Sequence, residues 1–282
     1  MVNNIKVEYT RNLLYEGYIK RFKDGILFES FSNTPLVIID FYLSNKNKSN
    51  EFSKLIYEDF KTKYILSENL TEGIEVTLEE VTSVVRNRAG SYHVKEEVKG
   101  LADVYDFIKE FPFEKNANFN AYILLHIHNL LFKYTPFNTA SGKFRESNTR
   151  ILGSIIELED YTLISKRFTE IYRKFNDILR LSENIELYIR SCIKLHAELI
   201  QIHPFFDGNG RSCRALNNLL MSYVGLPPTY VKLEEKTKYC EALEKAILKG
   251  DSSTLEQFFF YKIANAIIEN NPNFSQEALA IL

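Results

Sequence analysis

The sequence predicts a mainly α-helical protein with a small β portion near its N-terminus. From residue 51 onward, apolar residues recur at three- and four-residue spacing, which is the period of a helix with one buried face. Residues 5–43 instead alternate between polar and apolar side chains, as half-buried strands do. With 282 residues, the chain is long enough for one large core or two modest ones.

The strands are expected on either side of a turn at Lys23-Asp24-Gly25. YIKRF and ILFESF flank this turn, and PLVIIDFYL (35–43) is typical of a buried strand. A loop at 44–50 and a helix to about Leu66 follow. The next helix begins with a capping box from Thr77 to Glu80 and runs to about residue 87. Further helices are expected at residues 98–111, 118–132, 163–181, 183–202, 210–224, 235–249 and 254–270.

Residues 133–153 interrupt this helical pattern. Pro136, Asn138 and Gly142 disfavour a helix, and the residues from Lys143 onward alternate. We expect a hairpin or an extended loop here, whose exposed edge could dock another chain.

Composition excludes several functional classes. Lys and Arg (35) nearly balance Asp and Glu (37), so no bulk field attracts nucleic acid or an anionic membrane. The N-terminus lacks a signal-peptide pattern, and no apolar run approaches the ~20 residues of a membrane span, so we expect a cytoplasmic protein. Cys192, Cys213 and Cys240 have neither disulfide-framework nor zinc-site spacing, which predicts reduced thiols.

One segment concentrates residues suited to catalysis: HPFFDGNGRSCR at 203–214. Pro204 must end the preceding helix, which places His203 at a helix exit. Two glycines around Asn209 allow a turn whose amides, just before a new helix, favour an anion such as phosphate. Any of these residues alone is commonly structural, and Asp-Gly-Asn-Gly is usually a turn.

The charged side chains of this segment add cation and metal chemistry. Arg211 and Arg214 lie three residues apart, so both guanidinium groups can reach one polyphosphate. Asp207 supplies the carboxylate oxygen that Mg²⁺ accepts when it also binds nucleotide phosphates. Burying so many charges without a ligand would be costly, so we interpret the segment as a site.

The segment resembles the signature of the Fic family, H-P-F-x-D/E-G-N-G-R-x-x-R, at every specified position. The resemblance implies a Fic-type helical bundle with a β-hairpin flap, and an enzyme that transfers AMP from ATP to a Ser, Thr or Tyr hydroxyl of a target protein. His203 would deprotonate that hydroxyl, and Asp207 would hold Mg²⁺. Relatives that act as kinases tend to carry lysine at the position of Gly210, which favours AMP transfer here. The nucleotide-binding residues implied by the resemblance are Phe205, Gly208, Asn209, Gly210, Arg211, Arg214 and Tyr239, the last as a residue stacked on adenine.

The resemblance extends to the interrupted region. HIHNLL at 126–131 is similar to the helix that precedes the family's flap, and Gly142, Lys143, Phe144 and Arg145 are similar to the flap that aligns a target protein. His126 and His128 point in different directions on a helix, so structural roles are expected for both.

Many Fic proteins also carry an inhibitory helix, S/T-x-x-x-E-G/N, whose glutamate pairs with the second arginine of the signature. Residues 67–73, SENLTEG, are similar to it, although Ser67 lies one position early and Glu68 takes its place. The resemblance implies that Glu72 pairs with Arg214 and keeps activity low. If Glu72 instead orients water, the protein would also remove AMP.

We divide the chain into an N-terminal region (1–90), with the hairpin and the inhibitory helix, and a Fic catalytic domain (91–282). The alternative functions are a nucleotide-binding regulator, an enzyme that uses another donor and a DNA-binding regulator. The last is disfavoured because the sequence shows no basic recognition helix. The expected partner is a target protein, or the chain itself, and not nucleic acid or membrane. The cluster at 258–261, FFFY, either forms a homo-oligomer interface or, as is commoner, closes the core.

Overall fold

The structure is a computed structural model that describes residues 34–45, 54–86, 95–113 and 119–270. Within these ranges it consists of helices and connecting loops, without a strand. Most expected helices from residue 51 onward are confirmed, with ends that shift by a few residues. The helices are α2 (Thr34–Asn45), α3 (Lys54–Thr71), α4 (Leu78–Val85), α5 (Glu96–Glu110), α6 (Ile123–Phe132), α7 (Ile164–Leu179), α8 (Ile185–Ile202), α9 (Asn209–Tyr223), α10 (Lys236–Lys249) and α11 (Ser253–Asn270).

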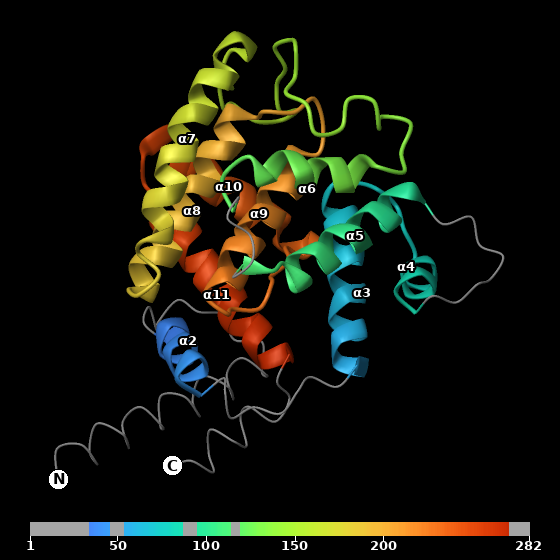
Figure 1. Cartoon of the computed structure of the whole chain (residues 1–282), viewed down its shortest axis with the longest axis vertical. Helices are drawn as coiled ribbons and strands as arrows, with labels where there is room; N and C mark the ends of the chain where they lie inside the picture. The colour runs from blue at the N-terminus through green and yellow to red at the C-terminus, as the bar shows by residue number, and fades with distance from the viewer. Residues whose placement is uncertain (1–33, 46–53, 87–94, 114–118, 271–282) are drawn as a thin grey trace.

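Helix α9 is the central element of the bundle. It packs against α5, α6 and α8, and it is buried from Asn209 to Met221 except at Gly210 (Figure 1). Asn218 anchors it to the following segment by donating to the Thr229 carbonyl at 2.8 Å and accepting from the Thr229 amide at 2.8 Å. A buried central helix fixes the position of its N-terminal turn, where the charged residues of the 203–214 segment begin.

Helix α3 packs against α4 and α5. It ends at Thr71, and the left-handed Gly73 (φ 77°) lets the Ile74 amide donate back to the Asn69 carbonyl at 3.0 Å. The capping box that starts α4 is confirmed: the Thr77 side chain accepts from the Glu80 amide, and the Glu80 carboxylate accepts from the Thr77 amide at 2.7 Å. The turn between these helices therefore has a defined geometry.

The prediction of a strand at PLVIIDFYL was wrong, because these residues lie in α2. Pro35, Ile38, Ile39 and Tyr42 are buried, at spacings of three, one and three residues, which is a helical face that packs on α11. Pro35 occupies the first turn, where a missing amide hydrogen has no consequence. The other two expected strands, YIKRF and ILFESF, lie outside the described residues.

The loop from α6 to α7 is irregular, and the expected hairpin in it does not form. The C-terminal aromatic cluster closes the core, as expected, since Phe259 and Phe260 on α11 are 2% and 5% exposed. Buried residues from α2 and α3 belong to the same hydrophobic cluster as those from α5 to α11. The boundary at residue 90 stays a prediction.

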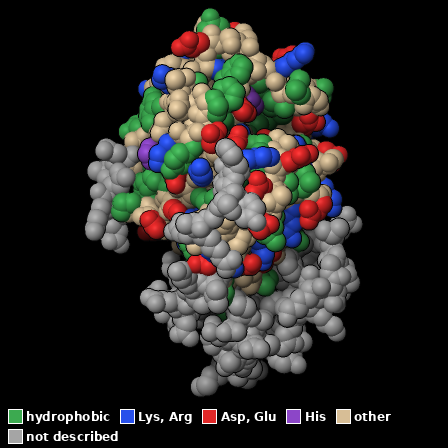
Figure 2. Space-filling model, turned by 90° about the vertical axis from the view of Figure 1, so that its right-hand side faces the viewer, with side chains coloured by type: hydrophobic (Ala, Val, Ile, Leu, Met, Phe, Trp, Pro, Cys, Tyr) green, Lys and Arg blue, Asp and Glu red, His purple; other side chains and the backbone are tan. Residues whose placement is uncertain are grey.

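Acidic and basic side chains are mixed over the face shown in Figure 2, in keeping with their balance in the sequence. None of the helices in the described part of the chain is long and apolar enough to cross a membrane.

Candidate active site

His203 occupies the C-terminal end of α8 in a left-handed conformation. Its φ of 50° is the only positive φ of a non-glycine residue in the described ranges. Such a conformation costs about 1 to 3 kcal/mol and persists where the surroundings enforce it, often at functional sites. Here the following Pro204 ends the helix, while the His203 amide still donates to the Leu199 carbonyl at 3.0 Å.

The imidazole of His203 has one nitrogen free to act as a base. Its Nδ1 lies 3.2 Å from the Ile200 carbonyl oxygen, which can only accept, so Nδ1 carries the hydrogen. Nε2 therefore keeps its lone pair. Burial lowers the pKa of His203 below its ordinary value of 6.5, which makes the ring neutral at pH 7.

Gly208 makes the turn that leads into α9. Its φ is 68°, and a Cβ added there would lie 2.4 Å from a ring carbon of Phe132, so only glycine fits. The Asn209 side chain braces the same turn: it accepts from the Phe205 amide at 2.8 Å and donates to the Phe205 carbonyl at 2.7 Å. The turn is thus held by side chains, and the first-turn amides of α9 remain available to an anion.

Arg211 is a buried cation with unused donors. Its side chain is 3% exposed, yet Nε and Nη1 have no hydrogen-bond partner in the described structure. The nearest carboxylate oxygen, Oδ2 of Asp207, is 3.7 Å from Nη2, and the guanidinium carbon lies 5.3 Å from the Phe132 ring centre. A buried guanidinium with orphan donors is a feature that a bound phosphate would explain.

Asp207 is the candidate metal ligand. Its side chain is 67% exposed, and one carboxylate oxygen accepts from the Gly208 amide at 2.6 Å, which leaves the other side open. The described residues contain no cluster of three or more His, Cys, Asp or Glu side chains able to hold a metal. A single open carboxylate fits Mg²⁺, which binds through one or two carboxylates together with substrate phosphates.

Arg214 is paired with two glutamates, Glu68 in the last turn of α3 and Glu72 just beyond its end. Its Nη2 donates to Oε1 of Glu72 at 2.6 Å, and its Nε donates to Oε2 of Glu68 at 2.9 Å. Burial raises the pKa of Glu68, against the opposing effect of Arg214. For Glu72, burial acts in the same direction but Arg214 outweighs it, so the pKa of Glu72 is lowered. The predicted partner of Glu72 is thus in contact with it, next to the first turn of α9.

The four predicted target-docking residues mainly anchor the loop. Arg145 is only 5% exposed: its amide donates to the Pro204 carbonyl and its Nε donates to the His203 carbonyl, both at 2.8 Å. Phe144 packs on Phe168, with ring centres 4.8 Å apart. Of these four residues, only Lys143 is exposed. Most side chains of this group thus hold the loop in position, and their role in docking a target stays a prediction.

His128 links the loop to the signature turn. Its Nδ1 accepts from the Gly142 amide at 2.8 Å, and its Nε2 donates to the Asp207 carbonyl at 3.1 Å. Burial lowers the pKa of His128 to about 4, so the ring stays neutral. The structural role expected for His128 agrees with these contacts, as does that of the nearby His126, whose ring packs 4.9 Å from that of Phe107.

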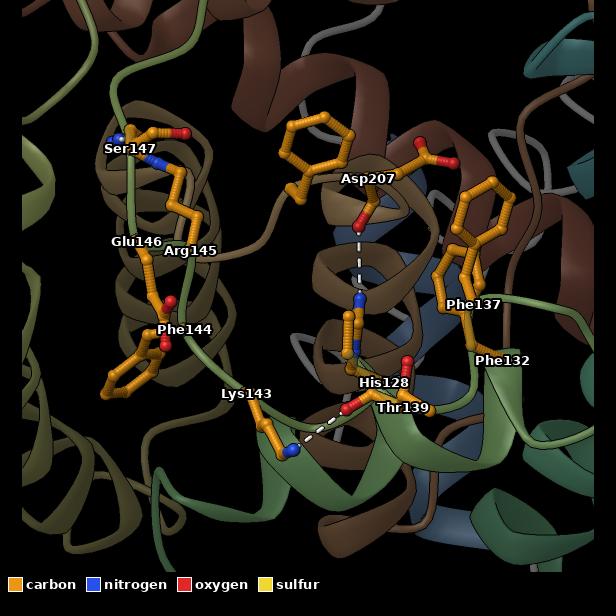
Figure 3. Close-up of a pocket in the computed structure, with 12 residues that line it drawn as sticks. His128, Phe132, Phe137, Thr139, Lys143, Phe144, Arg145, Glu146, Ser147 and Asp207 are labelled. Carbon is orange, nitrogen blue, oxygen red and sulfur yellow. Dashed lines mark hydrogen bonds between the residues drawn. The ribbon is translucent and has the colours of Figure 1, made fainter.

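A cavity of about 580 Å³ opens between this loop and the signature turn (Figure 3). Asp207 and His128 lie on its wall, with Lys143 and Arg145 on the loop side. Two phenyl rings that also line it are largely exposed, Phe137 at 62% and Phe206 at 69%. The cavity is large enough for a side chain of another protein to reach the wall formed by Asp207.

Two residues predicted to bind nucleotide are instead buried. Phe205 is 0% exposed and stacks on His128 with ring centres 3.8 Å apart. Tyr239 is 3% exposed, and its hydroxyl lies 2.7 Å from Nε2 of His196. Its ring lies 5.8 Å from the guanidinium carbon of Arg214, so it packs beside the arginine. That Phe205 and Tyr239 touch nucleotide stays a prediction.

Sequence reasoning missed the role of Glu68 and the burial of Arg145. The first had a signal, because Glu68 and Glu72 are four residues apart, which is the spacing of neighbours on one helical face. The second had none, since Arg145 donates to backbone carbonyls of residues 202 and 203, which lie far from it in the sequence.

Comparisons with known proteins agree with this geometry. Residues 118–221 match the model of the Fic/DOC family. A protein adenylyltransferase Fic from Nematostella vectensis is 25% identical over 191 residues, which cover 65% of this chain and 43% of the relative. Another from Culex quinquefasciatus is 26% identical over 181 residues, with 62% of this chain and 35% of the relative covered. The chain thus spans less than half the length of these curated relatives.

Solved structures show the same fold. A Fic-domain-containing signalling protein from Bacteroides thetaiotaomicron matches with a TM-score of 0.68 at 17% identity, over 86% of this chain and 98% of that protein. Fic-1 from C. elegans matches with a TM-score of 0.65 at 19% identity, over 95% of this chain and 77% of that one. The complete signature at 203–214 thus lies within the segment 118–221 that matches the Fic/DOC family, in a chain with the fold of solved Fic-domain structures.

Proposed function

We propose that this chain is a protein adenylyltransferase that transfers AMP from ATP to a Ser, Thr or Tyr hydroxyl of a target protein. The observation that carries the proposal is that the segment joining α8 to the first turn of α9 carries a neutral histidine with a free Nε2, an open carboxylate and a buried arginine with orphan donors. The names of the relatives support the same activity.

In the proposed reaction, Nε2 of His203 takes the proton of the target hydroxyl. The oxygen then forms a bond to the α-phosphorus of ATP, the bond from that phosphorus to the bridging oxygen breaks, and pyrophosphate leaves. Arg211, Arg214 and the first-turn amides of α9 would stabilise the charge on the β- and γ-phosphates. Positioning and charge stabilisation of this kind supply most of the rate in phosphoryl-group transfer. Mg²⁺ held at Asp207 would add neutralising charge at the phosphates when bound.

We further propose that Glu72 keeps the enzyme in a low-activity state. Its carboxylate occupies the Nη2 end of Arg214, 2.6 Å away, where a terminal phosphate would otherwise bind. Glu72 also lies against Gly210, since a Cβ there would be 2.8 Å from Oε1. Removing this carboxylate should therefore free both the arginine and the approach to the helix. With Glu72 kept, orientation of a water molecule would also allow AMP removal.

The experiment measures transfer of label from ATP into protein, with the label at the α- or the γ-phosphorus. The wild type is compared with Glu72→Gly, His203→Ala and the double variant. His126→Ala removes an imidazole outside the site, and Glu75→Gly removes an exposed carboxylate from the same connection between helices. Both serve as matched controls.

The proposal expects α-label that increases in Glu72→Gly, disappears in either variant that lacks His203 and is unchanged in the two controls. Label that enters only from the γ position would indicate a kinase. Absence of both labels, with ATP binding retained, would favour a nucleotide-binding regulator or a different donor. AMP removal is tested by following loss of label from a modified protein, which should need Glu72.

A further inference from the structure

Glu68 is an acidic side chain whose burial the proposed reaction does not explain. It lies inside α3 and is 0% exposed. Its carboxylate spans one edge of the Arg214 guanidinium, with Oε2 at 2.9 Å from both Nε and Nη2 and Oε1 at 3.2 Å from Nε. A fully buried carboxylate is costly unless a cation pairs with it, so this contact is specific to Arg214.

Glu72 holds the same arginine in a different way. It lies in the turn beyond the end of α3, its side chain is 30% exposed, and it contacts only Nη2. Glu72 can therefore withdraw by a change within this turn. Glu68 cannot, because its departure would unpack α3 from the core.

The third nitrogen of the guanidinium faces the helix N-terminus. A Cβ placed on Gly210, in the first turn of α9, would lie 3.0 Å from Nη1 of Arg214. Since the guanidinium is planar, holding its Nε–Nη2 edge fixes the direction of Nη1. Glu68 thus determines where the free end of the arginine points.

We propose that Glu68 is a positioning residue: it holds Arg214 by the Nε–Nη2 edge, so that the Nη1–Nη2 end, which Glu72 occupies through Nη2, meets the terminal phosphate of ATP once Glu72 has left. This inference rests on the proposed function and deepens it. It predicts that Glu68 contributes to the preference for ATP over ADP, because ADP lacks the phosphate that this arginine would meet.

The test measures the dissociation constants of ATP and ADP, each with Mg²⁺, by calorimetry in the Glu72→Gly protein. Two second substitutions are compared. Glu68→Gln removes the charge but keeps an oxygen that can accept from Nε, whereas Glu68→Ala removes both. Because both variants are neutral at this position, a loss of charge cannot account for a difference between them, and the unfolding curves show whether packing does. Thermal unfolding is recorded for each.

We expect Glu68→Gln to keep the ATP-over-ADP preference of its Glu72→Gly parent. In Glu68→Ala this preference should be about tenfold smaller, because ATP itself must then order the arginine. ADP affinity should be equal in the two variants. Should Glu68→Ala fail to fold, Glu68→Asp takes its place: it keeps the charge, but its carboxylate is one methylene short, and it should lose the preference as well.

The inference would be overturned if Glu68→Gln and Glu68→Ala preferred ATP over ADP to the same extent, or if Glu68→Asp kept the preference of its parent. The proposed function would remain intact in either case. A Glu72→Gly protein that is folded yet binds neither ATP nor ADP would overturn the proposed function and this inference with it.

Discussion

Removing the Glu72 carboxylate should tighten ATP binding by an amount that follows from its contact with Arg214. The perturbation is Glu72→Gly, with Glu72→Gln as the milder change. The contact is a charge-assisted hydrogen bond of 2.6 Å between a nearly buried arginine and a glutamate that is 30% exposed. Such bonds contribute about 1.5 to 3 kcal/mol, and partial exposure to water favours the lower half of that range.

ATP has to displace this bond in the wild type but not in Glu72→Gly. A difference of about 2 kcal/mol corresponds to an affinity about thirtyfold higher. Glu72→Gln keeps a hydrogen bond from the charged arginine to a neutral acceptor, which we take as roughly half as strong, so its affinity for ATP should increase about fivefold. Calorimetric titration with ATP and Mg²⁺ measures both, and Glu75→Gly, which removes an exposed carboxylate nearby, should match the wild type.

Equal ATP dissociation constants for the wild type, Glu72→Gln and Glu72→Gly would refute this reasoning. It would mean that the ion pair does not compete with the nucleotide. A tightening of the same size in Glu75→Gly would refute it as well, since a general loss of negative charge would then account for the effect.

Three further predictions concern the signature turn. Burial lowers the pKa of His203 below 6.5. The rate of AMP transfer by the Glu72→Gly protein should therefore stay constant as the pH falls to 6.5, and it should decline at lower pH as the base becomes protonated. Label-transfer rates from about pH 5 to 8 measure this dependence. Gly208→Ala should lower the free energy of unfolding by at least about 2 kcal/mol, measured by denaturant titration, because of its positive φ and the close Phe132 ring. Asp207→Asn should raise the Mg²⁺ concentration needed for half-maximal transfer by about tenfold or more, in a metal titration.

The sequence was sufficient to predict those features of the structure that depend on neighbouring residues. The capping box at Thr77, the helix stop before Pro204 and the glycine turn at Gly208 each depend on residues within a few positions of one another. Their physical causes are backbone hydrogen bonds and backbone sterics, which do not require knowledge of the fold.

Local sequence patterns gave the wrong secondary structure where an apolar run fitted both a strand and a helix. PLVIIDFYL contains enough apolar residues to resemble a buried strand, although Ile38, Ile39 and Tyr42 also form a helical face. Packing against α11 selects the helix, and that contact lies more than 200 residues away in the chain. A Thr-Pro pair at the start was the available sign of a helix N-terminus.

The candidate site was predicted unevenly for the same reason. The Glu72–Arg214 contact could be expected from a family pattern, because that pattern records a long-range pair. The burial of Tyr239 and Arg145 depends on how separate segments cross, which spacing along the chain does not encode. Glu68 is intermediate: its place one turn before Glu72 was visible, but its full burial was not.

The central claim is AMP transfer from a site whose base is His203. The most direct measurement counts α- and γ-label from ATP in the same protein band, in Glu72→Gly and in Glu72→Gly/His203→Ala. The account predicts α-label without γ-label in the first protein and neither label in the second. Gamma-label in the first protein, or α-label that persists without His203, would contradict it.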